Sequence, residues 1–218
     1  MTDTTSAPKV DHDALRLDEL GALCATLDGM SEAQWNADSL CDGWRVRDVV
    51  GHMLTGYTTP MPKMLAKVAG YRFNIDKASA IESRVLGSAH SPSELLEMLT
   101  TVQRDNSKKG ISRVIPTSEG LVDHVIHHLD ITRPLGLPTT TNETNRRAAM
   151  ARVVTLGGMV RAKGRVKGLK VTATDLDWSW GAGPEIRGTA DDLLLALSGR
   201  PAGVANLEGA GVAVLTSR

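Results

Sequence analysis

The sequence predicts a helical bundle followed by a small α+β domain. Up to about residue 134, apolar residues recur three and four positions apart, which is the spacing of one face of a helix. After residue 168, apolar and polar residues alternate over short runs separated by glycine and aspartate, which is typical of strands and turns. We therefore expect a bundle at 1–138 and an α+β domain at 143–218, joined by a polar linker at 139–142.

The bundle should contain about four long helices. Asp11 can cap the first helix, and Ser91 and Glu94 form a capping box with proline at the first helical position. Pro60 and Pro62 should interrupt the second helix. The expected helices are 12–29, one that begins near 46, a weaker one at 74–87, one from 92 to about 105, and one around 120–131 that should end before 134.

The second domain should begin with a helix at 143–163 and continue into strands near 169–173 and 176–180. Residues 181–184 and Gly188 supply turns. Thr189 can cap a helix that Gly199 closes, and Val212–Leu215 should form a final short strand. About 70 residues make a marginal core, so we expect this domain to pack against the bundle.

Composition excludes several classes of protein. The chain has 25 basic and 25 acidic residues, so no overall field favours nucleic acid or an anionic membrane. Neither a signal peptide nor a run of about 18 apolar residues is present, so we expect a cytoplasmic protein. We further expect a monomer or homodimer whose partners are small molecules. The chain has two cysteines. Cys24 lies on the apolar stripe of the first helix and is expected in the core, whereas Cys41 lies in a loop and is either an unreactive or a reactive thiol.

Three of the six histidines lie within five residues of the helix expected at 120–131. His124 and His128 are four apart, so they lie on one face of the helix and can reach one metal ion. His127 falls opposite the apolar stripe and is expected to be solvated. A divalent metal needs at least a third protein ligand.

His52 is the best candidate for that third ligand, because it lies inside another amphipathic helix and facing helices of a bundle converge on internal metal sites. His52, His124 and His128 would form a three-histidine site with an open position, which is the arrangement of catalytic zinc. The alternative is three histidines that lie on helix surfaces or make only structural hydrogen bonds.

Three segments carry a resemblance that covers most of the chain. They are Trp35 with 43–52, then 124–136, and finally 183–201. In this order they resemble the mycothiol-dependent maleylpyruvate isomerase family, whose members combine a DinB-like metal-binding four-helix bundle with a sterol-carrier-like C-terminal domain. The resemblance implies His52, His124 and His128 as metal ligands. In the family the position four before the last histidine is often glutamate, and His124 departs from this.

The resemblance implies a divalent metal, best zinc for three imidazoles, with nickel, iron and manganese as alternatives. Asp48 and Asp130 are then either partners that orient the histidines or solvated helix carboxylates. Arg200 either holds a carboxylate of the substrate or thiol as a bidentate fork or bonds carbonyls at a helix C-terminus. No residue beyond these is assigned a catalytic role.

The activity implied by the resemblance is that of a mycothiol-using transferase or cis–trans isomerase acting on a small electrophile. The metal would lower the pKa of the thiol. Two alternatives remain: a metal-dependent hydrolase, for which no buried glutamate base is evident, and a non-enzymatic metal-binding module.

Overall fold

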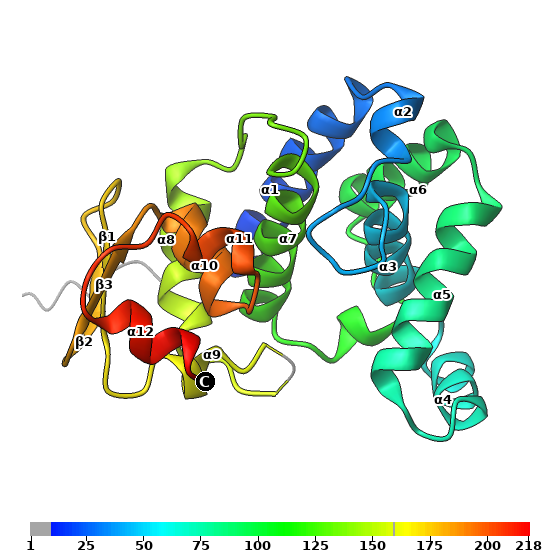
Figure 1. The fold of residues 1–218 in the computed structure, drawn as a ribbon. Coiled ribbons are helices and arrows are strands. Elements are labelled where there is room, and N and C mark those ends of the chain that lie inside the picture. Colours follow the sequence, from blue (N-terminus) through cyan, green and yellow to red (C-terminus); the bar gives the residue numbers. More distant parts are fainter. Residues whose placement is uncertain (1–9, 159) are drawn as a thin grey trace, which may run out of the picture.

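The computed structural model describes residues 10–158 and 160–218. Its N-terminal part is a bundle in which α1 (His12–Asp28) packs against α6 (Pro92–Asp105) and α7 (Thr117–Thr132), and α3 (Val46–Thr58) packs against α6 and α7 (Figure 1). Around these four lie short α2 (Glu32–Trp35), α4 (Met61–Gly70), α5 (Ile75–Ala89) and a 3₁₀ turn, η1 (Ile111–Arg113).

Local capping sets the helix starts. The Asp11 carboxylate accepts hydrogen bonds from the backbone N–H groups of Asp13 and Ala14, and the Ser91–Glu94 capping box opens α6. These caps, the break before α4 and the predicted helix at 74–87 all appear close to the expected positions. The helix predicted around 120–131 begins at Thr117, with Pro116 in the capping position.

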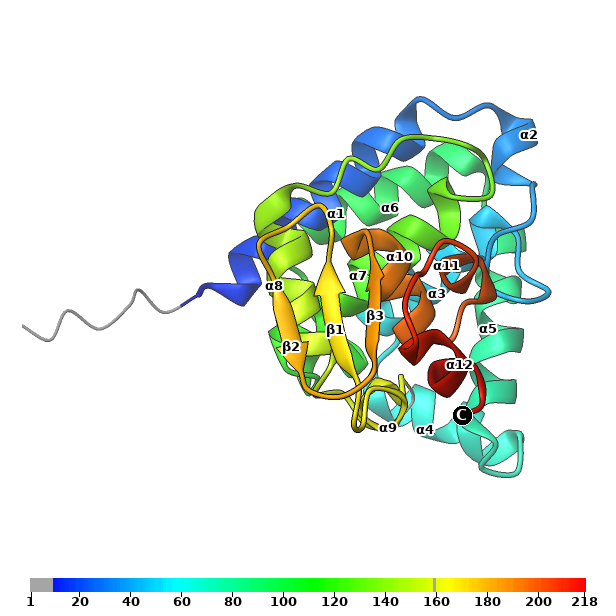
Figure 2. The same ribbon diagram turned by 60° about the vertical axis from the view of Figure 1, so that its left-hand side comes forward.

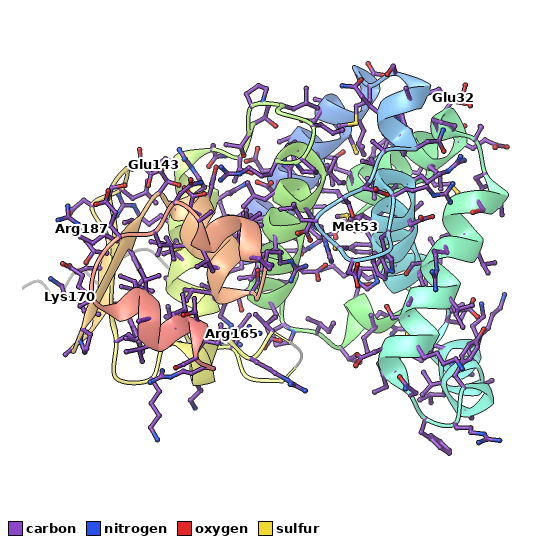
Figure 3. The ribbon with its side chains drawn as sticks, in the orientation of Figure 1. Glu32, Met53, Glu143, Arg165, Lys170 and Arg187 are labelled. Atoms are coloured by element: carbon purple, nitrogen blue, oxygen red, sulfur yellow. The ribbon has the colours of Figure 1, made fainter. Side chains whose placement is uncertain are left out.

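The C-terminal part is a three-stranded sheet with short helices. The strands are β1 (Lys170–Ala173), β2 (Ser179–Gly181) and β3 (Glu185–Gly188), in the order β2-β1-β3, with β1 antiparallel to β2 and parallel to β3 (Figure 2). Lys170 and Arg187 point outward from the sheet (Figure 3). The helices are α8 (Glu143–Val153), α9 (Ala162–Arg165), α10 (Ala190–Leu197), α11 (Pro201–Val204) and α12 (Gly211–Thr216).

Three local predictions for this part were wrong. The helix predicted at 143–163 ends at Val153, and a turn separates it from α9. Gly188, expected in a turn, is instead the last residue of β3, a strand at Glu185–Gly188 that was not predicted and that pairs with β1. Val212–Leu215 lies in helix α12, which packs against the edge strand β3 and does not pair with it, and Leu215 is its buried apolar side chain.

The described residues form two hydrophobic cores, and α7 contributes mainly to the second. Side chains of α1, α3 and α6, with Trp35 of α2 and Ile131 of α7, form the first core. The apolar stripe of α7, which includes Leu121, Val125 and Leu129, packs with α8, β1 and α10 in the second. The opposite face of α7 is therefore turned towards α3 and the bundle interior (Figure 1).

The predicted fold class is confirmed: the chain is mostly helical with one small sheet. Among the described helices, none combines the length and the apolar character needed to cross a membrane.

Candidate metal centre

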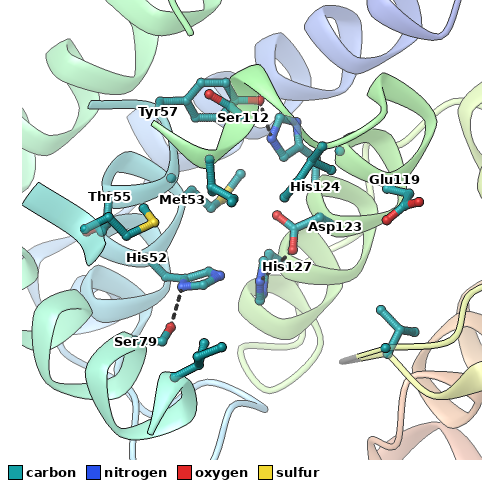
Figure 4. A pocket seen from close by; sticks show the side chains of 18 of the residues that line it. His52, Met53, Thr55, Tyr57, Ser79, Ser112, Glu119, Asp123, His124 and His127 are labelled. Carbon is teal, nitrogen blue, oxygen red and sulfur yellow. Dashed lines mark hydrogen bonds and ion pairs between the residues drawn. The ribbon is translucent and has the colours of Figure 1, made fainter. Parts of the chain in front are cut away.

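A pocket of about 760 Å³ lies in the bundle between α3, α4, α5, η1 and α7. The segment after α8 and the side chain of Arg200 complete its wall. Three histidines line it, namely His52, His124 and His127, together with Asp123 (Figure 4). His128 does not line it.

His52 reaches the pocket from α3, at a point where α3 and α5 cross closely. A side chain at Gly51 would meet the Ser83 carbonyl oxygen at 2.4 Å, and one at Gly87 would meet the Arg47 carbonyl oxygen at 2.7 Å, so both positions need glycine. This approach lets the Ser79 hydroxyl of α5 bond His52 Nδ1 at 3.1 Å (Figure 4). Nε2 is then the nitrogen left to bind a ligand.

His127 lies across the pocket from His52, with the two ring centroids 5.0 Å apart. Its Nδ1–H donates to the buried Asp130 carboxylate at 2.9 Å, and its Nε2 lies 3.4 Å from Asp123 Oδ1. Asp123 stands four residues before His127, and its side chain is about half exposed, 49%, because it faces the pocket.

The electrostatics of the two histidines differ. Burial, reinforced by the nearby His127, lowers the pKa of His52 to about 4, so its imidazole is neutral. Burial alone would also lower the pKa of His127, but Asp123 and Asp130 favour its charged form and raise that pKa well above the usual value. The pKa of Asp123 is lowered in return, against the effect of burial, chiefly by His127.

His52, Asp123 and His127 form a group that fits a divalent metal. One ligand atom from each lies within 4.8 Å of the others. Two imidazoles and a carboxylate are the donors of many catalytic zinc sites. Ligands at about 2.1 Å from zinc lie roughly 3.4 Å apart in a tetrahedron, and His127 Nε2 and Asp123 Oδ1 are separated by 3.4 Å.

His124 and His128, the pair predicted from spacing, are bound to other side chains, although His124 also lines the pocket. His128 is fully buried against α1, where its Nδ1 donates to Glu19 at 2.8 Å and its Nε2 lies 3.2 Å from the Thr26 hydroxyl. His124 Nε2 is hydrogen-bonded to the Tyr57 hydroxyl at 2.9 Å. The structure thus brings His52 together with Asp123 and His127, and not with the predicted pair.

The reason for this one-residue offset is the packing of α7. The sequence placed His127 opposite the apolar stripe and therefore in solvent. The stripe packs against the C-terminal elements, so the side opposite to it faces the pocket. The sequence did contain a signal for this pair. Asp123 lies four positions before His127, so two residues of types that bind metals share that face of the helix.

Asp48 and Asp130, the two carboxylates expected to orient the histidines, have different partners in the structure. Asp130 contacts His127, as the first alternative expected. Asp48 contacts no histidine: it caps α3 by accepting from the backbone N–H and the guanidinium of Arg45. Asp48 is buried, so the expectation of a solvated carboxylate was wrong as well.

Arg200 anchors Asp130 from the C-terminal part. Its Nε and Nη2 donate to the two Asp130 oxygens at 3.0 and 2.8 Å, and its Nη1 donates to the Ser198 carbonyl at the end of α10. Burial alone would raise the pKa of Asp130, but the bonds from His127 and Arg200 lower it to about 2. Cys41 Sγ lies 3.1 Å from Asp130 Oδ2 and 3.9 Å from His127 Nδ1, so this thiol joins the same cluster.

Comparison with known proteins identifies the N-terminal part. Residues 16–106 match the sequence profile described as "Mycothiol maleylpyruvate isomerase N-terminal domain". Over these residues the chain is similar to the N-terminal domain of the mycothiol maleylpyruvate isomerase family. The match includes His52 and ends before α7.

Two solved structures share the fold of the family. A crystal structure of the mycothiol-dependent maleylpyruvate isomerase is 15% identical, covers 96% of both chains and has a TM-score of 0.61. A variant of an enzyme with that name, with one histidine replaced by alanine, is 14% identical over the same share of both chains, with a TM-score of 0.58. No curated protein sequence matches the chain.

Proposed function

We propose that this protein is a metal-dependent enzyme that uses mycothiol as a nucleophile towards a small electrophile. The observation that carries the proposal is the convergence of His52, Asp123 and His127 in a large pocket of the bundle. The match of residues 16–106 to the N-terminal domain of mycothiol maleylpyruvate isomerases supports mycothiol as the thiol. The likeness in fold to a mycothiol-dependent maleylpyruvate isomerase agrees with it.

The side chains around the group are arranged to hold a metal. Ser79 occupies Nδ1 of His52 and Asp130 occupies Nδ1 of His127, so each ring presents Nε2 to the pocket. A divalent ion bound there, best zinc, would lower the pKa of a thiol well below about 8.5 and so favour the thiolate. Three protein ligands leave a position for the thiol.

The reaction we propose is addition of the thiolate to an activated alkene. The sulfur forms a bond to one alkene carbon, and the π electrons move to the other carbon, next to the activating carbonyl. Uptake of a proton there gives the thioether of a transferase. If the adduct is not protonated, rotation about the former double bond, followed by return of the electron pair and loss of the thiolate, gives the cis–trans isomer instead.

Two parts of the earlier expectation are modified in this proposal. The metal ligands are His52, Asp123 and His127, which restores a carboxylate four positions before the last ligand histidine. Arg200 does not bind the substrate directly in this proposal. Its guanidinium is bound to the Asp130 carboxylate, so Arg200 fixes the position of Asp130 and thereby of His127. We further propose a cytoplasmic enzyme acting on small molecules, where a low-molecular-weight thiol is available.

The test is the metal content of the purified protein, by elemental analysis after loading with zinc. We expect about one equivalent in the wild type, lost in His52→Ala, Asp123→Ala and His127→Ala. His128→Gln and His124→Gln are matched controls on α7 and should retain the metal. Metal loss from His128→Gln with retention in His127→Ala would favour the ligand set predicted from spacing.

Consumption of mycothiol is measured next, with an activated alkene as acceptor. We expect thiol loss or alkene isomerisation that depends on the metal and is absent from His127→Ala. A protein that binds one metal and accelerates neither reaction would be a metal-binding module, and water attack on esters would then be assayed for the hydrolase alternative.

A further inference from the structure

The wall of the pocket opposite α7 is apolar. Helix α4, the start of α5 and the region of η1 supply it, and none of the residues of α4 is buried. Leu65 and Ile75 are 61% and 57% exposed although they line the pocket. The apolar lining residues of this wall are Met61, Met64, Leu65, Val68, Ile75, Ile111 and Ile115.

Other described residues cover this apolar surface only in part. Transfer of such surface from water to a ligand stabilises a complex by about 25 cal/mol for each Å². Met61 and Met64, with Met53 behind them, are flexible and polarizable and can adapt to ligands of several shapes. A cavity of about 760 Å³ lies within the size range of sites for drug-sized ligands, roughly 300–1,000 Å³.

The charged side chains of the pocket are already paired. Lys67 pairs with Glu82, Arg152 with Glu119, and Arg200 with Asp130. Arg16 and Lys108 both pair with Asp13. Every cation that lines the pocket within residues 10–158 and 160–218 therefore has a carboxylate partner in contact.

Arg16 is also committed to other groups. Its Nη1 donates to the Tyr57 hydroxyl at 2.7 Å, and its Nη2 contacts the Asn106 amide oxygen. The Arg16 side chain is only 2% exposed. A dicarboxylate entering the pocket would find the guanidinium and ammonium groups, its strongest side-chain partners, already bound to carboxylates of the protein.

From these observations we propose that the electrophile of this enzyme is an uncharged, largely apolar molecule and not a dicarboxylate. The inference rests on the proposed function for the role of the molecule as electrophile. Its apolar part lies along α4, with the reactive carbon towards His52 and His127. The paired cations then remain in place when the substrate binds.

Binding of the neutral fluorescent dye Nile red tests the substrate class. Dibutyl maleate and disodium maleate are compared as competitors, because they share one activated alkene and differ in charge and apolar surface. We expect dibutyl maleate to displace the dye at a concentration at least tenfold below that of maleate. Displacement by maleate at an equal or lower concentration would overturn the proposal.

Two substitutions on α4 locate the binding surface. Val68→Asp places a charge on the pocket wall, and Ala66→Asp places the same charge on an exposed position of α4 outside the pocket. We expect Val68→Asp to weaken the binding of Nile red and dibutyl maleate at least tenfold, and Ala66→Asp to change it less than twofold. Equal effects of the two variants, with native circular dichroism in both, would contradict the assignment.

These measurements separate the two proposals. Dye displacement needs neither metal nor thiol, so it is repeated with His127→Ala. Retained preference for dibutyl maleate in a variant without metal supports the substrate class whether or not the metal proposal stands. A metal-loaded, thiol-consuming enzyme that prefers maleate would retain the proposed function and refute the substrate class.

Discussion

Helix α7 carries two pairs of ligand-type residues at the same spacing, and the structure gives them different roles. Asp123 and His127 face the pocket, and His127 keeps Nε2 directed towards it. His124 and His128 lie about 100° further round the helix. There His128 has both nitrogens in contact with Glu19 and Thr26, in a region with no space for a ligand.

The difference shows that helical spacing indicates which side chains share a face but not what that face meets. A metal ligand needs a lone pair directed into open space, whereas a fully buried histidine needs hydrogen-bonding partners for both nitrogens. Glu19, on α1, binds Nδ1 of His128. Asp130 binds only Nδ1 of His127 and leaves Nε2 on the pocket side.

The largest expected difference between the two pairs is in stability. His128→Ala removes the imidazole partner of the fully buried Glu19 carboxylate, which keeps only the neutral donors Thr141 and Asn145, and should cost about 3–5 kcal/mol. His127→Ala should cost only about 1–2 kcal/mol, because Asp130 keeps its bidentate bond to Arg200. Urea denaturation of both variants measures the difference, and equal losses would refute the structural role of His128.

Asp130→Asn tests the role of His127 through the affinity of the protein for zinc. The amide no longer fixes the His127 tautomer by accepting a charge-assisted bond, so zinc affinity should fall about 10–100-fold. Asp48→Asn is the control: it weakens the cap of α3 by about 1 kcal/mol and should leave zinc affinity unchanged. Competition with a chromophoric chelator gives both affinities, and similar affinities for the two variants would remove Asp130 from the centre.

Gly51→Ala tests the crossing that places His52. The new methyl group would lie 2.4 Å from the Ser83 carbonyl oxygen, so α3 and α5 must separate, at a cost of about 1–3 kcal/mol. Gly70→Ala in α4 has open space around it and should be neutral or slightly stabilising. Thermal unfolding compares the two, and a stable Gly51→Ala protein would show that the crossing is not tight.

The smallest effect concerns acid stability. Burial alone would raise the pKa of Glu19, but hydrogen bonds and charge from His128 lower it overall. The unfolded chain therefore binds more protons, and this contribution is present above the unfolded pKa of about 4.3 and declines as pH falls through the folded pKa. In Glu19→Gln, the free energy of unfolding measured by urea titration should fall less steeply between pH 6 and pH 3 than in the wild type. An unchanged pH dependence would exclude Glu19 as its source.

The sequence by itself determined the local structure of the bundle. The caps at Asp11 and Ser91 and the break at Pro60 depend on neighbours within four residues, so their positions could be predicted. His52 could be predicted for the same reason, as a polar residue at the flank of an amphipathic helix. Over the N-terminal part, the family resemblance is confirmed.

Tertiary structure decided the rest, because it depends on which surfaces meet. Residues 185–188 became a strand because β1 lies beside them, whereas Val212–Leu215 became a helix that packs against β3 without pairing with it. The proposed site uses Asp123 and His127 in place of the predicted pair, because the apolar stripe of α7 packs against the C-terminal elements and these two residues face the pocket. A sequence gives the angle between two side chains on a helix, and only the packed structure gives the direction in which either of them points.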